Sequence, residues 1–176
     1  MADALADRIR SLIRDVPDFP KPGILFKDIT PIFADAEAFQ GLIGAFADRY
    51  RALRPDAIVG IESRGFLVAA PLALALGCGT IIVRKPGKLP RKTRVQRYAL
   101  EYGLDELHLH EDALHPDQNV IVVDDLLATG GTMRAACDLV EQAGARVAET
   151  AFIVELSFLK GRARVAPAPA WSLVTY

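Results

Sequence analysis

The residues best suited to chemistry lie close together, in the segment 120–132 with the sequence VIVVDDLLATGGT. Its four leading apolar residues are typical of a strand buried on both faces, and the small residues near its end predict a turn into a helix. Thr129, Gly130 and Gly131 allow consecutive backbone N–H groups to converge without obstruction from Cβ atoms, which makes an anion-binding nest. Thr132 adds a hydroxyl at the helix N-terminus, where unpaired N–H groups favour a phosphate. We expect this turn to lie at the surface.

Asp124 and Asp125, which close the predicted strand, require a different ligand. Two carboxylates repel a phosphate, but they accept hydrogen bonds from the vicinal hydroxyls of a ribose, directly or through the water shell of a divalent cation. The segment is not a Walker phosphate loop, because the lysine of GxxxxGK[ST] is missing. Gly77-Cys78-Gly79 is not a dinucleotide-binding turn, because it precedes a strand rather than a helix. The simpler interpretation, in which two acids end a strand and two glycines make a turn, does not account for the complete arrangement.

A strongly basic segment lies between two apolar strands. Residues 84–100 contain seven of the 21 lysines and arginines and no acidic residue. Pro86, Gly87 and Pro90 predict a loop. Two interpretations stay open: a solvated surface loop, or a lid that binds anions at the carboxyl end of a strand.

The elements that position these residues alternate between strands and helices. Apolar spacing predicts helices over 2–15, 36–54, 65–76 and 131–143, and strands over 57–61, 80–83, 119–123, 147–154 and 171–175. The prolines and glycine between residues 17 and 23 predict an irregular loop that runs to residue 29. The strands lack polar alternation, which indicates a doubly wound α/β fold with a mostly parallel central sheet flanked by helices. Ligands of such sheets bind beyond the carboxyl ends of the strands.

Composition limits the classes of function. A chain of 176 residues with 51% hydrophobic and 24% charged residues is typical of one globular domain. The net charge of −1 excludes a protein that coats nucleic acid, for which a strongly basic domain is the first sign. We therefore expect no nucleic-acid partner.

Cysteine use and hydropathy indicate a cytoplasmic protein without a membrane segment. Cys78 and Cys137 are far apart and show no CxxC spacing, so neither a disulfide framework nor a zinc ribbon is indicated. The charge-free stretch 65–83 is divided by Pro71 and by the glycines near residue 78 into a helix and a strand, each too short to span a bilayer. His108 and His110 share a strand face but lack a third ligand, so no direct protein ligand set for a metal is assigned.

As a set, the motifs resemble the type I phosphoribosyltransferases, and within that family the branch that uses adenine. VIVVDDLLATGGT is similar to the family's binding motif for 5-phosphoribosyl-1-pyrophosphate (PRPP). The other matching segments are residues 18–29 (DFPKPGILFKDI), 60–66 (GIESRGF), 84–90 (RKPGKLP) and 98–103 (YALEYG). They are similar to the base-covering hood, the pyrophosphate loop and the two ends of the catalytic lid. The match extends from about residue 17 to about residue 160.

The resemblance implies a role for each matching position. It implies a single domain over 1–176, with a hood over about 1–34 and a flexible lid over about 84–104. It implies that the 5′-phosphate is held by Ala128, Thr129, Gly130, Gly131 and Thr132, and that the ribose and Mg²⁺ are met by Asp124 and Asp125. The implied pyrophosphate ligands are Ser63, Arg64, Arg84 and Lys88, with a strained peptide at Glu62-Ser63. The implied adenine ligands are Leu25 through its backbone, Phe26 by stacking, and Lys27. The implied catalytic carboxylate is Glu101.

The implied reaction is purine salvage: adenine and PRPP give AMP and pyrophosphate. Displacement at the anomeric carbon passes through an oxocarbenium-like state, and Mg²⁺, bound as the PRPP or pyrophosphate complex, with Arg64 and the basic lid would neutralise the leaving group. The resemblance also implies a homodimer. One alternative is a different purine specificity on the same fold, against which the hood segment argues. Another is a non-catalytic PRPP-binding regulator that binds nucleic acid, against which the net charge and the presence of Glu101 argue.

Overall fold

The structure is a computed structural model that describes residues 2–100 and 103–176. It contains two compact units, Met1–Arg49 and Tyr50–Tyr176. The larger unit carries the central sheet and the segment predicted to bind phosphate, and the smaller unit carries the segment that resembles a hood. A single domain over 1–176 remains a prediction.

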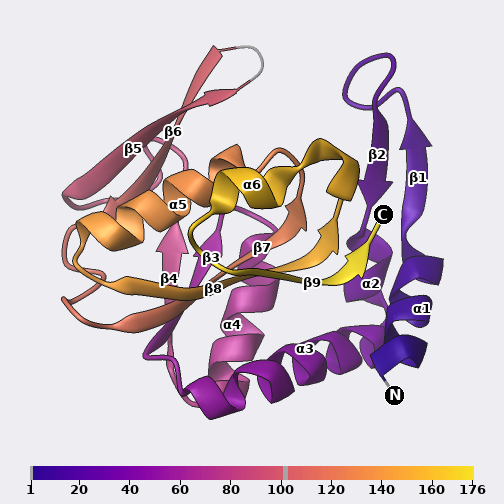
Figure 1. Cartoon of the computed structure of the whole chain (residues 1–176), viewed down its shortest axis with the longest axis horizontal. Coiled ribbons are helices and arrows are strands. Elements are labelled where there is room, and N and C mark those ends of the chain that lie inside the picture. Colours follow the sequence, from indigo (N-terminus) through magenta and orange to yellow (C-terminus); the bar gives the residue numbers. More distant parts are fainter. Residues whose placement is uncertain (1, 101–102) are drawn as a thin grey trace. The chain divides into compact units, whose positions relative to one another are not determined.

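The larger unit is built on a five-stranded parallel sheet in the order β4-β3-β7-β8-β9 (Figure 1). The strands are β3 (Ala57–Ile61), β4 (Gly79–Val83), β7 (Asn119–Leu127), β8 (Arg146–Glu155) and β9 (Ala170–Thr175). Each predicted strand is present, and the doubly wound α/β class is confirmed. The apolar runs predicted this outcome because the middle strands of such a sheet are buried on both faces.

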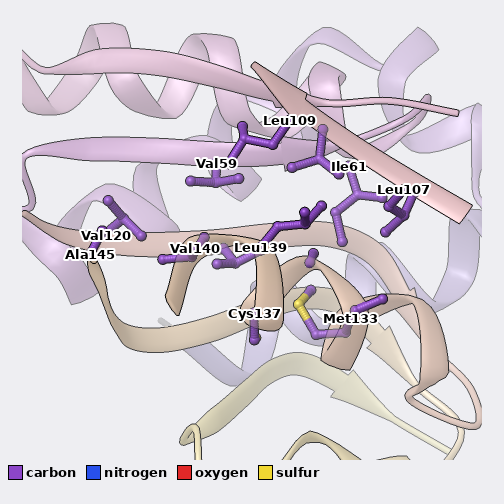
Figure 2. Close-up of a cluster of buried hydrophobic side chains, with 14 of the residues drawn as sticks. Val59, Ile61, Leu107, Leu109, Val120, Met133, Cys137, Leu139, Val140 and Ala145 are labelled. Carbon is purple, nitrogen blue, oxygen red and sulfur yellow. The ribbon is translucent and has the colours of Figure 1, made fainter. Parts of the chain in front are cut away.

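Helices cover both faces of this sheet. On one face, α5 (Gly131–Gln142) packs its buried residues against the side chains of Val59, Ile61 and Val120 (Figure 2). On the other face, α4 (Gly65–Leu76) packs closely on β3, since a Cβ atom at Gly60 would lie 2.6 Å from the Cβ atom of Ala69. The short α6 (Gly161–Val165) contributes the buried Val165 to the α5 side. Both helices predicted in this unit are present, α4 with the predicted bounds.

The basic segment differs from the prediction of a loop. Its second half forms β5 (Thr93–Leu100), which pairs antiparallel with β6 (Gly103–His110). Buried Tyr98 alternates with exposed Arg97 and Ala99, which is the period-2 pattern of a strand with one covered face. Backbone hydrogen bonds of 3.0 and 2.8 Å join Arg84 to His108 and fix the hairpin to the segment that follows β4. A flexible lid loop therefore remains a prediction only for the remainder of the segment.

The smaller unit contains a hairpin where the prolines predicted an irregular loop. The predicted helix over 2–15 ends earlier, as α1 (Ala2–Leu12), and is followed by β1 (Arg14–Pro17). β1 pairs antiparallel with β2 (Leu25–Asp28), so the loop predicted to run to residue 29 is instead the turn and the second strand of a hairpin. The short α2 (Thr30–Ala34) precedes α3 (Ala36–Tyr50).

The other differences are at element ends. The predicted helix over 36–54 ends at Tyr50 and continues as one 3₁₀ turn, Arg51–Leu53, which stops at Arg54 with φ of +44°. β7 extends four residues beyond the predicted strand end at 123, so both aspartates lie inside the strand. Within residues 2–100 and 103–176, no helix combines the length and apolar character needed to cross a bilayer.

Candidate active site

A cavity of about 320 Å³ lies at the carboxyl ends of β3, β4 and β7 in the larger unit. Because these strands are parallel neighbours, the residues that follow them meet at one edge of the sheet. The lining residues are Glu62, Ser63, Arg64, Lys85, Asp124, Asp125, Leu126, Leu127, Ala128, Thr129, Gly130, Gly131, Thr132 and Met133. The structure thus brings together the predicted phosphate turn, the acid pair and part of the predicted pyrophosphate loop.

The phosphate turn connects β7 to the N-terminus of α5. Gly130 is the N-cap of α5 with φ of +81°, a conformation that residues with a Cβ atom rarely adopt. No side chain caps this helix end, so the first backbone N–H groups of α5 are directed to the turn. The expectation of a surface turn is wrong for Gly130, which is buried. A Cβ atom there would lie 2.5 Å from the carbonyl oxygen of Gly161.

The acid pair is held in two different environments. Asp125 is 6% exposed, and its Oδ2 atom accepts a hydrogen bond of 2.5 Å from Nε of Arg64. The backbone N–H of Asp125 donates to Oδ1 of Asp124 at 2.9 Å. Asp124 keeps some accessible surface, but the dense protein around its carboxyl group still desolvates it. That desolvation and the neighbouring Asp125 carboxylate raise the pKa of Asp124 well above its ordinary value, while Arg64 opposes the shift.

The raised pKa of Asp124 predicts that Asp124→Asn stabilises the fold while it removes a predicted ribose ligand. A carboxyl group whose native pKa exceeds its unfolded value binds its proton more tightly in the native state. Stability then falls as pH rises from the ordinary pKa of 3.8 to the raised native pKa, and the full cost persists at higher pH. Asparagine removes this cost, so at pH 7–8 the variant should melt higher, by ~2–4 °C for each kcal/mol recovered.

Thermal unfolding of the parent and variant across pH 4–8 measures this difference. Asp105→Asn is the control of opposite sign. Although burial opposes it, the hydrogen bond from Lys85 lowers the pKa of Asp105, so this substitution should lower the melting temperature near neutral pH. A gap between parent and Asp124→Asn that shrinks as pH rises would contradict the prediction.

Glu62, to which the sequence assigned no contact, organises the predicted pyrophosphate loop. The Glu62–Ser63 peptide is cis, at the position where a strained peptide was expected. The Glu62 carboxylate accepts two hydrogen bonds of 3.2 Å from Arg84 and one of 2.8 Å from the backbone N–H of Lys85. Although burial opposes it, these contacts lower the pKa of Glu62, so the carboxylate stays charged.

The cations after β4 separate into two groups. Lys85 lines the cavity, whereas Arg84 and Lys88 do not. The Arg84 guanidinium is held by Glu62 instead. The sequence pattern predicted Arg84 and Lys88 as pyrophosphate ligands but not Lys85. Successive side chains of an extended segment point to opposite sides, so Arg84 and Lys85 cannot both face the cavity. That alternation was the available signal, but the sequence does not say which of the two residues faces inward.

The predicted adenine ligands lie in the smaller unit, on β2. Leu25 is 51% exposed, the Phe26 ring contacts Phe19 edge-to-face at 5.0 Å, and Nζ of Lys27 bonds Asp15 at 2.6 Å. Their grouping with the cavity stays a prediction. Glu101, the predicted catalytic carboxylate, lies outside the described residues. Among the residues that are described, no group of three or more His, Cys, Asp or Glu side chains is arranged to hold a metal ion.

Comparison with known proteins agrees with this geometry. Residues 29–172 match the family model of the phosphoribosyl transferase domain. The chain is 55% identical to adenine phosphoribosyltransferase of Roseiflexus sp. over 98% of its own length and all of the relative. The crystal structure of the Thermoanaerobacter pseudethanolicus enzyme of that name superposes with a TM-score of 0.94 at 48% identity, covering 97% of this chain and 99% of that one. The Saccharomyces cerevisiae enzyme, in complex with adenine and an imino-altritol bisphosphate, gives 0.93 at 44% identity with the same coverage.

Proposed function

This chain belongs to the phosphoribosyltransferase family, and from that premise we propose that it transfers the 5-phosphoribosyl group of PRPP to adenine. The products are AMP and pyrophosphate, so the enzyme is a pentosyltransferase of purine salvage. Relatives that match it over nearly their whole length are adenine phosphoribosyltransferases. The observation that carries the proposal is the single cavity that collects a phosphate turn, an acid pair and two cations.

Each end of this cavity suits one end of PRPP. The 5′-phosphate would be held by the backbone of residues 128–132 and by the Thr132 hydroxyl, through charge-assisted hydrogen bonds worth ~1.5–3 kcal/mol each. Asp124 and Asp125 lie beside this turn, where they would accept hydrogen bonds from the ribose hydroxyls. A site for phosphate alone would not explain the two carboxylates, whereas a site for a phosphorylated sugar does, because its hydroxyl groups donate hydrogen bonds to them.

The opposite end suits a leaving pyrophosphate. The bond from a purine nitrogen to the anomeric carbon forms while the carbon–oxygen bond to pyrophosphate breaks. Ser63 and Arg64 would bind the departing anion, and Lys85 is the further cation that lines the cavity. In the proposal Arg84 and Lys88 add positive charge beside it, with Arg84 anchored on Glu62. Cations fixed in advance stabilise the charge that develops as the bond breaks.

The donor set fits Mg²⁺ carried by the substrate. Two carboxylates on one strand supply the hard oxygen ligands that Mg²⁺ prefers, but too few for an all-protein site. Asp124 and Asp125 would therefore hold the ion through its water shell. When bound, the ion supplies positive charge at the pyrophosphate oxygens.

Adenine recognition is assigned to β2 of the smaller unit. We propose that the Leu25 backbone pairs with the adenine edge, that Lys27 lies at the base, and that Phe26 stacks on the ring. Phe26→Ala should raise the KM for adenine, since base–aromatic stacking is worth ~1–3 kcal/mol per base. The KM for PRPP should stay within about twofold. Steady-state kinetics with each substrate varied in turn measures both values.

A matched control for this substitution lies in the larger unit. Phe158, 68% exposed, is a phenylalanine without a proposed role, so Phe158→Ala should leave both KM values unchanged. An unchanged adenine KM in Phe26→Ala would remove Phe26 from the binding site.

Two further assignments concern assembly and location. We propose a homodimer, supported by apolar side chains on the outer face of α4, where Leu74 is 84% exposed and Leu67 is 47% exposed. Sedimentation equilibrium gives the mass directly. We propose a cytoplasmic location, because Cys78 and Cys137 are free thiols, as in a reducing compartment. Burial raises the pKa of the Cys137 thiol to about 12, so it stays protonated and unreactive.

The activity is tested by mixing the purified chain with PRPP, adenine and Mg²⁺ and following AMP and pyrophosphate together. The proposal expects the two products in equal amounts. Release of pyrophosphate without AMP would indicate hydrolysis and would contradict the proposed transfer.

A further inference from the structure

The phenolic oxygen of Tyr98, on β5, joins two residues that line the cavity. It accepts a hydrogen bond of 3.0 Å from Nζ of Lys85 and one of 3.3 Å from Oγ1 of Thr132. It donates its own proton to Oδ2 of Asp105, on β6, at 2.9 Å. Asp105 also pairs directly with the Lys85 ammonium group. We refer to Lys85, Tyr98, Asp105 and Thr132 as the Tyr98 cluster.

The members of the Tyr98 cluster divide by position. Lys85 and Thr132 line the cavity, Lys85 from the segment that follows β4 and Thr132 from the predicted phosphate turn. Tyr98 and Asp105 do not line it and come from the hairpin. The hairpin therefore contacts one cation and one hydroxyl that both line the cavity.

Stability alone is a weak explanation for this cluster. The Lys85 and Asp105 side chains are 36% and 26% exposed, and ion pairs with that access to water contribute only modestly to folding, consistent with the small decrease in melting temperature expected of Asp105→Asn. The geometry is nevertheless specific, because one buried hydroxyl group uses its single proton and accepts two donors. A specific arrangement with little value for stability indicates a role in function.

We propose that Tyr98 and Asp105 are positioning residues for the transfer reaction, holding the Lys85 ammonium group at the pyrophosphate end and orienting the Thr132 hydroxyl at the phosphate end. The inference rests on the proposed function, because it takes the cavity as the PRPP site. Neither residue touches the substrate in this account. Both act through the two cavity-lining side chains that they contact.

The hydrogen-bond donors of the Tyr98 cluster also couple phosphate binding at the turn to the position of Lys85. The Thr132 hydroxyl has one proton, which it donates to Tyr98 in this structure. A phosphate at the turn that accepts this proton leaves the Thr132 oxygen free to accept in turn from Tyr98. Asp105 then loses the Tyr98 proton and keeps only the Lys85 ammonium group as its side-chain donor. Phosphate binding at the turn thus strengthens the ion pair between Asp105 and Lys85.

The test uses Tyr98→Phe, which keeps the buried ring and removes only the hydroxyl, and Asp105→Asn, which keeps the shape and removes the charge. Asp112→Asn is the matched control, because Asp112 also pairs with a cation, Arg91, but lies outside the cavity. We expect Tyr98→Phe and Asp105→Asn each to lower kcat/KM for PRPP by ~10- to ~100-fold, as misplaced catalytic contacts do. In both variants the KM for adenine should stay within about twofold of the parent value. The melting temperature of Tyr98→Phe should stay within about 3 °C of the parent. Asp112→Asn should have the kcat/KM of the parent.

Two further measurements test whether the two residues act together and whether Asp105 acts by positioning Lys85 rather than by its charge alone. The double variant should lose much less than the product of the single losses, because both residues act through Lys85. Calorimetric titration with pyrophosphate and Mg²⁺ should show weaker binding in Asp105→Asn, although removal of a negative charge by itself would tighten it. Tighter binding, independent losses, or single losses within about twofold would each overturn the proposal.

Failure of the inference differs from failure of the proposed function. If the parent forms no AMP, the proposed function fails, and the pyrophosphate titration still decides whether Asp105 positions Lys85. If the parent is active and both variants match it, only the positioning roles are wrong.

Discussion

Replacing Gly130 with alanine is expected to weaken PRPP binding strongly and to lower the melting temperature. The new Cβ atom would lie 2.5 Å from the Gly161 carbonyl oxygen, at a φ of +81° where a side chain already costs ~1–2 kcal/mol. Either the turn or α6 must move. A displaced turn loses at least two of its charge-assisted hydrogen bonds to phosphate, each worth ~1.5–3 kcal/mol, so affinity should fall by ~100-fold or more.

Gly77→Ala separates backbone strain from loss of the phosphate turn. Gly77 ends α4 with φ of +73°, and nothing lies within 4 Å of a Cβ atom placed there. This control should lower the melting temperature without changing PRPP affinity. Calorimetry with PRPP on the parent and both variants makes the comparison. Parent-like affinity in Gly130→Ala would show that the turn does not hold the phosphate.

Glu101→Gln is expected to lower kcat and kcat/KM for PRPP together, by ~10²–10⁴-fold, with little change in PRPP affinity. The substitution keeps the size of the side chain and removes its negative charge. If that charge acts only while the ribose becomes cationic, its loss affects the transition state and leaves the ground state unchanged. This role follows from the resemblance of the YALEYG segment to the end of the family's lid.

The matched control for Glu101→Gln is a glutamate among the described residues. Glu106 on β6 pairs with Arg97 at 2.7 Å and does not line the cavity, so Glu106→Gln should react at the parent rate. Single-turnover measurements report the chemical step in each protein. A chemical step in Glu101→Gln within about threefold of the parent would remove Glu101 from the catalytic assignment.

The sequence predicted the central sheet well because its physical signals are local and strong. The apolar runs that became β3 and β7, and the break at Gly77 that ends α4, each report burial or backbone conformation directly. The acid pair and the glycine turn were recognised for the same reason, since few other arrangements use those residue types at that spacing. The meeting of Ser63 and Arg64 with the turn then follows from the parallel order of the strands.

The rest depends on tertiary contacts that local patterns do not carry. The hairpin β1–β2 was hidden by prolines, since only its pairing across the turn reveals it. β5 was read as a loop because its basic composition concealed the alternation that places Tyr98 inward. Buried Gly130 was expected at the surface because its neighbour Gly161 is distant in sequence. The inward direction of Lys85 was unpredictable, because it depends on the contact between Arg84 and Glu62.

The most direct test of the central claim offers adenine, hypoxanthine, guanine and xanthine separately to the unmodified chain with PRPP. The nucleoside monophosphate formed from each base is measured. A site built to hydrogen-bond the 6-amino group of adenine rejects a 6-oxo base, because the mismatched partners are left unpaired, at a cost of ~10⁴-fold in kcat/KM. The account predicts that adenine alone is converted at an enzymatic rate. Conversion of hypoxanthine as efficiently as adenine would contradict it.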